Sequence, residues 1–167
     1  MLQIRPETAA DVDAIGRITQ QAFNGLPHSQ QTEHLLIAAL RTAGALSVSL
    51  VAEERGEIIG HIGFSKVLIG GEEHAWFGLA PLSVAPARQR SGIGQALIAA
   101  GLAHLDALGA QGCVVLGDPA YYRRFGFRPQ PGLVLADVPA DYFMTHTTCV
   151  PCPQGSVSFH PTFALCG

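Results

Sequence analysis

A single stretch, residues 84–97 (VAPARQRSGIGQAL), constrains the fold of this chain more than any other. An extended apolar run leads into a short basic loop, and an amphipathic helix begins at the glycine pair Gly92 and Gly94. Small residues let the backbone approach a ligand, and the first amides of a helix have no partner within it. The stretch therefore predicts a strand–loop–helix unit that binds an anion, with positive charge added by Arg88 and Arg90.

Other phosphate-binding motifs fit this stretch less well. A Rossmann dinucleotide site needs a third glycine, and Leu97 stands at that position. A P-loop needs Gly-Lys-Ser or Gly-Lys-Thr, which the sequence lacks. A loop-to-helix turn without any ligand is the simpler alternative, but the preceding strand and the flanking arginines favour an anion site.

The periodicity of apolar residues predicts a single domain over residues 1–167 of mixed α/β (α+β) class. The order of elements implies a mixed central sheet with helices on both faces. The expected strands are 2–5, 46–53, 58–69, 73–84, 112–116 and 155–160. The expected helices are 12–23, 30–43 and 92–108, with helical turns in 120–125 and a capping box over 8–11.

A proline inside the expected strand 73–84 conflicts with a regular sheet. Pro81 has no N–H, so it removes one hydrogen bond of the ladder. A β-bulge in this strand resolves the conflict. Such a bulge would splay the strand away from the strand over 112–116, and the unpaired edges could then accept a ligand as an additional strand.

The composition excludes several classes of protein. The chain is 48% hydrophobic and 14% charged, as expected of a folded domain, and its net charge is -3 with one lysine, Lys66. No extended basic face is evident, so we expect no nucleic-acid partner. No apolar run is long enough to cross a membrane and no signal peptide is recognisable, so we expect a cytoplasmic protein with reduced cysteines.

Two motifs resemble those of the GNAT (GCN5-related) N-acetyltransferases. The order Gln89-x-x-Gly-x-Gly resembles the loop of that family that holds the pyrophosphate of coenzyme A. The order Tyr122-x-x-x-Gly-Phe has the spacing of a tyrosine that often lies beside the coenzyme A sulfur. Longer runs over 76–84, 117–127 and 157–163 resemble the YhbS-type branch of predicted bacterial acetyltransferases.

The resemblance implies the GNAT fold and acetyl-CoA as co-substrate, with transfer of the acetyl group to a primary amine by direct attack on the thioester. It implies that backbone amides of the loop hold the pyrophosphate and that the strand before the loop pairs with the pantetheine arm. The implied cofactor-binding residues are Leu82, Ser83, Val84, Gln89, Arg90, Ser91, Gly92, Ile93, Gly94 and Gln95. The chain departs from many members after Leu116, where Asp118-Pro119 replaces an Asn and shortens the following helix.

The same resemblance implies a catalytic role for Tyr122. The departing thiolate needs a proton, and a phenol of pKa about 10 is neutral at pH 7 and can donate one. Tyr121 is the alternative donor, because adjacent helical side chains point about 100° apart and cannot both face the sulfur. A packed aromatic pair without catalytic function is the structural alternative.

The general base is not identified by the sequence. Glu72, Glu73 and His74 near the start of the bulged strand are candidates for a water relay, although each fits a solvated turn equally well. His61 is expected to be a surface or hydrogen-bonded core histidine, with the acceptor cleft as the alternative. A Cys/His cluster near the C-terminus consists of His146, Cys149, Cys152 and His160. A structural zinc site needs four ligands and the sequence has no second paired motif, so we expect no metal site there.

Alternatives to an enzyme remain at this stage. The same loop could serve a coenzyme A-binding sensor or an inactive GNAT relative, and the cysteine pair could serve a small metal-binding interaction module. The acceptor, a small-molecule or peptide amine, is expected between 23–36 and 137–153. Oligomeric state stays open, with a homodimer among the alternatives.

Overall fold

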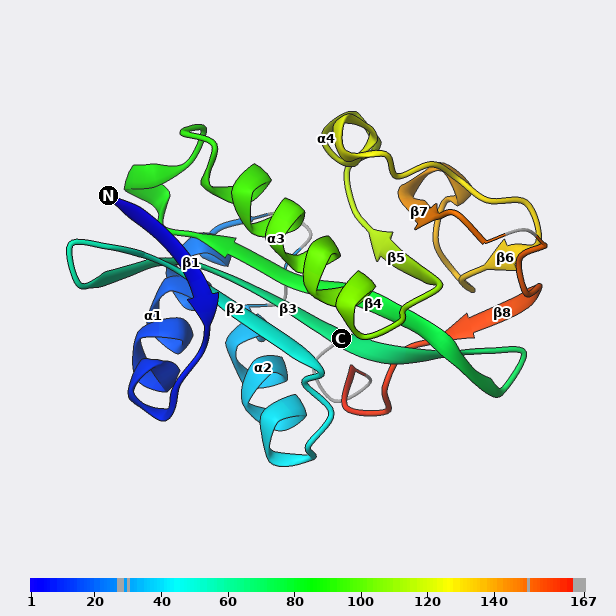
Figure 1. Ribbon diagram of the computed structural model, residues 1–167, viewed down its shortest axis with the longest axis horizontal. Helices are drawn as coiled ribbons and strands as arrows, with labels where there is room; N and C mark the ends of the chain where they lie inside the picture. The colour runs from blue at the N-terminus through cyan, green and yellow to red at the C-terminus, as the bar shows by residue number, and fades with distance from the viewer. Residues whose placement is uncertain (27–28, 30, 150, 164–167) are drawn as a thin grey trace.

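The computed structural model describes all residues except 27–28, 30, 150 and 164–167 (Figure 1). The α-helices are α1 (Val12–Phe23), α2 (Glu33–Thr42), α3 (Ile93–Ala107) and α4 (Pro119–Tyr122). The strands are β1 (Leu2–Pro6), β2 (Val48–Glu54), β3 (Glu57–Ile69), β4 (Glu72–Val84), β5 (Gly112–Leu116), β6 (Leu133–Val134), β7 (Phe143–Thr147) and β8 (Gly155–Ser158).

The strands form one mixed sheet in the order β1-β2-β3-β4-β5-β7, and β8 joins the end of β3 and pairs with β6. The pairs along the main path are antiparallel except β4 with β5, which run parallel. A parallel pair needs a crossover connection, and α3 supplies it. The predicted mixed sheet is therefore confirmed.

Helices cover both faces of the sheet, as predicted. In Figure 1, α1 and α2 lie together on one face, and α3 lies across the other. The crowded core beneath α3 includes Phe64, Leu97 and Phe127, none of which is exposed. None of the helices in the described part of the chain combines the length and apolar character that crossing a bilayer demands.

The parallel pair β4–β5 is short, and the two strands separate beyond it. Ladder pairing joins Trp76–Gly78 to Gly112–Val114, and the Gln111 amide donates to the Ala75 carbonyl at 2.7 Å. Beyond Gly78, β4 has no ladder partner on that side among the described residues (Figure 1). The register of β4 on β3 also shifts between Leu79 and Leu82, where β4 holds one more residue than β3. The predicted bulge and splay at Pro81 are thus confirmed, and the Ala80–Pro81 peptide is cis.

Most predicted elements lie within a few residues of their expected bounds, and β7 is the largest difference. No strand was expected at 143–147, yet β7 pairs with β5 along five residues. Its pairing with β5 and the packing of Phe143 against Val67 and Trp76 all join residues distant in the sequence, so no local pattern predicts this strand. The predicted start of α2 at Gln30 lies outside the described residues, and the structure shows this helix from Glu33.

The predicted capping box before α1 is confirmed and belongs to a larger polar cluster. The Asp11 carboxylate accepts hydrogen bonds from the Thr8 amide at 2.7 Å and from the Arg5 guanidinium at 2.7 and 3.0 Å. These bonds hold the pKa of the buried Asp11 carboxyl well below its usual range. Arg5 also donates to Glu53 of β2 at 2.8 Å, which ties the start of α1 to the edge of the sheet.

Close approach of α3 to the sheet depends on Gly101. A Cβ on this residue would lie 2.4 Å and 2.5 Å from ring atoms of the fully buried Phe64. Neither side can move freely, because cores are packed to crystal-like density. Gly101 therefore sets how closely α3 packs on β3.

We expect Gly101→Ala to destabilise the protein by about 1–3 kcal/mol through overpacking. The matched control is Gly16→Ala in α1, where a Cβ would meet nothing within 4 Å. That variant should be neutral or up to about 1 kcal/mol more stable, because alanine favours a helix interior over glycine. The measurement is chemical denaturation of both variants. Equal effects would show that α3 has room to retreat from the sheet.

Candidate active site

The loop between β4 and α3 ends in a backbone that exposes amide groups. Gly92 is the N-cap of α3 and has φ +86°, and Arg90 has φ +65°. Both lie in the left-handed region, which glycine adopts without strain. The amides of Ile93, Gly94 and Gln95 follow in the first turn, where an α-helix supplies no carbonyl partner. The predicted anion-binding geometry of the helix start is therefore present in the backbone.

Side chains of the loop hold it in this shape. Gln89 donates from Nε2 to the Val84 carbonyl at 3.1 Å, and the Ser91 hydroxyl donates to the Arg88 carbonyl. Arg88 itself pairs with Glu54 of β2 at 2.5 Å, which raises the pKa of Arg88 and lowers that of Glu54. Arg88 thus anchors the loop to the sheet and is not available to a ligand in this arrangement.

The unpartnered side of β4 presents backbone groups. Ala85 donates its N–H to the Ile59 carbonyl of β3 at 2.9 Å. Because N–H directions alternate along a strand, the N–H groups of Val84 and Leu82 point the other way, toward the side that β5 has left. This edge can therefore pair with an extended ligand.

A cleft of about 610 Å³ joins these features. Its walls come from the end of α1, the open side of β4, the loop, the start of α3 and the helical segment at α4. Most of the predicted cofactor-binding residues line it, namely Leu82, Val84, Gln89, Arg90, Gly92, Gly94 and Gln95. The other three are placed differently: the Ser83 hydroxyl donates to Thr19, Ser91 closes the loop, and Ile93 is buried in the core.

Tyr121 lies in the wall of the cleft, at the start of α3. Its hydroxyl oxygen lies 2.5 Å from the position that a Cβ would occupy on Gly94, so only glycine leaves room for it there. The N-cap of α4, Asp118, accepts from the Ala120 amide at 3.0 Å and fixes this short helix. Partial burial raises the pKa of Tyr121, and Arg124 opposes that rise.

Tyr122 points elsewhere and packs more deeply. Its ring lies against Gly117, where a Cβ would come within 2.5 Å, and makes an edge contact with Phe127 at 5.7 Å between centroids. Gly117 directly follows β5, on the side where β4 and β5 separate. Burial raises the pKa of the Tyr122 phenol strongly, so the group keeps its proton throughout the neutral range.

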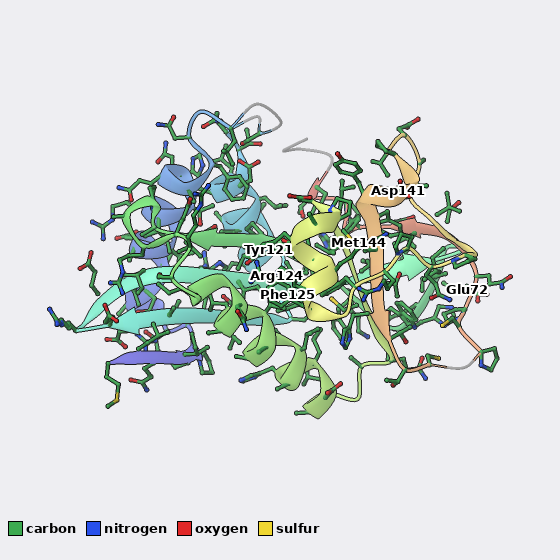
Figure 2. The ribbon with its side chains drawn as sticks, turned by 90° about the horizontal axis from the view of Figure 1, so that it is seen from above. Glu72, Tyr121, Arg124, Phe125, Asp141 and Met144 are labelled. Carbon is green, nitrogen blue, oxygen red and sulfur yellow. The ribbon has the colours of Figure 1, made fainter. Side chains whose placement is uncertain are left out.

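Two arginines give the cleft its positive charge. Arg90 comes from the loop and Arg124 from the turn after α4, so they stand on different walls. The Arg124 guanidinium lies 5.8 Å from the Tyr121 ring centroid and 5.4 Å from that of Phe125. Figure 2 shows these three side chains gathered beside the end of β4. Phe125 was not predicted as a lining residue, because only the fold of the α4 turn directs it there.

The carboxylates suggested as bases lie at the opposite end of β4. Glu72 pairs with Ile69 next to the β3–β4 turn, far from the Tyr121 label in Figure 2. Glu73 is exposed and forms an ion pair with Lys66. Neither these two nor His74 lines the cleft.

The Cys/His cluster shows no metal-binding geometry. Among the described residues, no group of three or more His, Cys, Asp or Glu side chains lies close enough to hold a metal ion. Cys149 and Cys152 are free thiols whose sulfurs donate to backbone carbonyls at 3.2 and 3.0 Å. His160 contacts Thr162 at 3.0 Å instead of either thiol. Cys166 lies outside the described residues.

A comparison with protein families identifies residues 45–129 with the acetyltransferase (GNAT) domain. The N-acetyltransferase YhbS of Escherichia coli K12 is 37% identical over 125 residues, which cover 74% of this chain and 72% of that protein. YjhQ of the same strain, also an N-acetyltransferase by name, is 41% identical over 88 residues, 52% of this chain and 49% of its own length.

Solved structures of similar proteins agree with this. A GNAT family acetyltransferase from Brucella melitensis, crystallised with acetyl-CoA, has a TM-score of 0.88 and 47% identity, with 98% of each chain covered. E. coli YhbS in complex with CoA has a TM-score of 0.91 and 31% identity, covering 98% of this chain and 92% of its own. The sheet with its splayed β4–β5 pair is the fold of these proteins.

Proposed function

Because this chain belongs to the GNAT family of acetyltransferases, we propose that its cleft binds acetyl-CoA and that the protein transfers the acetyl group to a primary amine. The observation that carries the proposal is one cleft of about 610 Å³ that joins the amide-rich start of α3 to the open edge of β4. One end suits a diphosphate and the other suits an extended amide chain. Coenzyme A contains both a diphosphate and an extended amide chain. Of two similar proteins, one was crystallised with acetyl-CoA and the other with CoA.

Each part of the cofactor has a matching part of the cleft. The pyrophosphate would accept hydrogen bonds from the amides of residues 90–95, at the positive end of the α3 dipole. Arg90 and Arg124 flank that position from two walls. The pantetheine arm would pair with the Leu82 and Val84 edge as an additional strand. An outward N–H of this edge can then polarise the thioester carbonyl as charge develops on its oxygen.

The proton donor to the departing thiolate is the tyrosine Tyr122, supported by its spacing to the Gly-Phe pair and its position against Gly117, beside the gap between β4 and β5. Its raised pKa keeps the phenol protonated until the thiolate forms. Tyr121 is the competing donor, supported by its place in the cleft wall. Its contact with the Gly94 region suits a role in cofactor binding instead.

We expect Tyr122→Phe to lower kcat by about 100-fold or more, because general acid catalysis is lost while the ring remains. Tyr121→Phe should mainly raise the KM for acetyl-CoA. The assay is release of free thiol from acetyl-CoA with a panel of primary amines. The reverse pattern would assign proton donation to Tyr121. Tight coenzyme A binding with no turnover on any amine would favour the sensor function over the enzyme.

We expect Gly92→Glu and Gly94→Glu to weaken coenzyme A binding by at least about tenfold, because a carboxylate would stand where the pyrophosphate binds. The matched control is Gly71→Glu in the β3–β4 turn. Gly71 matches Gly92: its φ is +77° against +86°, and a Cβ at either position meets nothing within 4 Å. Titration calorimetry with coenzyme A measures the effect. Unchanged affinity in the loop variants would disprove the assigned binding site.

A further inference from the structure

A chain of polar groups, of which His61 is buried and the others half-buried, lies on the face of the sheet that α1 and α2 cover. His61 of β3 has no exposed surface, and its Nε2 lies 2.8 Å from the Ser49 hydroxyl of β2. Ser49 donates to the Glu7 carboxylate, which Arg41 of α2 holds at 2.9 and 3.0 Å. Burying so many polar groups is costly unless they are paired, so their arrangement calls for an explanation.

The hydrogen bonds determine which nitrogen of His61 carries the proton. Ser49 has one hydroxyl proton and donates it to Glu7, so its oxygen can only accept from His61. Nε2 therefore bears the hydrogen and Nδ1 presents a lone pair. Nδ1 is buried and has no hydrogen-bond partner in the described structure. A buried acceptor without a partner is rare in folded proteins and calls for an explanation.

The His61 ring lies close to the bulge of β4. His61 pairs with Ser83, just beyond the bulge, and Gly63 stands next to both the ring and the bulge. A Cβ on Gly63 would lie 3.5 Å from Cε1 of His61 and 3.2 Å from the Ala80 carbonyl oxygen. The imidazole and the bulge therefore both border the space beside Gly63, where Leu46 Cδ1 also lies 3.1 Å from the Cβ position.

The described lining of the cleft contains no carboxylate and no imidazole that could take a proton from an amine. Its ionisable side chains are those of Arg90, Arg124 and Tyr121. An amine that arrives as an ammonium ion must lose a proton before it can attack a thioester. His61 pairs with the bulged strand β4, and its buried Nδ1 has no hydrogen-bond partner among the described residues, so it can supply a base behind the cleft wall.

We propose that His61, Ser49 and Glu7 form a proton relay that deprotonates the amine acceptor; this rests on the proposed acetyl transfer. Nδ1 of His61 takes the proton from the amine, directly or through a water at the bulge. The Nε2 proton passes to the Ser49 oxygen while the Ser49 proton passes to the Glu7 carboxylate. The neutral amine nitrogen then forms the new bond to the carbonyl carbon, the C–S bond breaks, and the departing thiolate takes the Tyr122 proton. The nitrogen gives its surplus proton to the Tyr122 phenolate, which leaves a neutral amide and restores the phenol.

The surroundings of His61 favour passage of the proton over its storage. Burial lowers the pKa of His61 to about 4; the Glu7 charge opposes this shift and Arg41 adds to it. A persistent His61 imidazolium is therefore unfavourable, and the proton passes through Ser49 to Glu7. Glu7 retains 17% side-chain exposure and its pKa is lowered by Arg41 and Ser49, so it releases the proton to solvent.

The kinetic test compares Ser49→Ala with Thr19→Val, since Thr19 forms the neighbouring buried bond to Ser83 at 3.2 Å but no part of the relay. We expect Ser49→Ala to lower kcat at least about tenfold with little change in the KM for acetyl-CoA. The loss should shrink for aromatic amines, which arrive without a proton at pH 7. Thr19→Val should keep its kcat. Equal kcat in both variants would overturn the relay.

A second measurement does not depend on turnover. Nitrogen NMR of histidine-labelled protein should show His61 with a protonated Nε2 and a bare Nδ1 at pH 7, and Ser49→Ala should shift the Nε2 resonance. A protonated Nδ1 would overturn the proposal whatever the kinetics. The outcomes distinguish the relay from the acetyl transfer. If the relay is wrong, the wild-type protein still acetylates amines; if the acetyl transfer is wrong, the wild-type protein shows no turnover.

Discussion

The active site depends on how little backbone joins β4 to β5. Three residue pairs hold the two strands together, and beyond Gly78 each strand turns from the other. The bulge at Ala80–Pro81 reinforces this separation, because it adds a residue to β4 without lengthening β3. Three features of the proposed cofactor site follow from that gap: a free strand edge, room for the start of α3, and space for α4, which carries Tyr121 and Tyr122.

Charge and backbone geometry have separate roles in the loop between β4 and α3. Glu54 engages Arg88, so one arginine stabilises the shape of the loop while Arg90 remains in the cleft. The left-handed backbone at Gly92 turns the chain into α3 with its first amides free. Helix amides bind phosphate through direction and dipole as well as charge, so the net charge of -3 does not oppose the proposed anion site.

The sequence predicted what depends on neighbours along the chain. Strand 112–116, the capping box before α1 and the bulge at Pro81 rest on local patterns, and the structure confirms all three. Long-range pairing was harder: β7 gains its place from β5, and Phe125 reaches the cleft only through the turn after α4. The spacing to the Gly-Phe pair pointed to Tyr121 and Tyr122 but did not reveal which ring faces the cleft. That depends on how the two rings pack against Gly94 and Gly117.

The short β4–β5 contact also bears on how the molecule responds to its ligand. The segment from β5 to β7, with α4 between them, is attached to β4 through three paired residues, and the cleft walls belong to both sides of that junction. A cofactor lying between them would supply the missing strand and bridge Arg90 to Arg124. A ligand that binds only the folded state adds to its stability, so coenzyme A in this position would stabilise the short contact between β4 and β5.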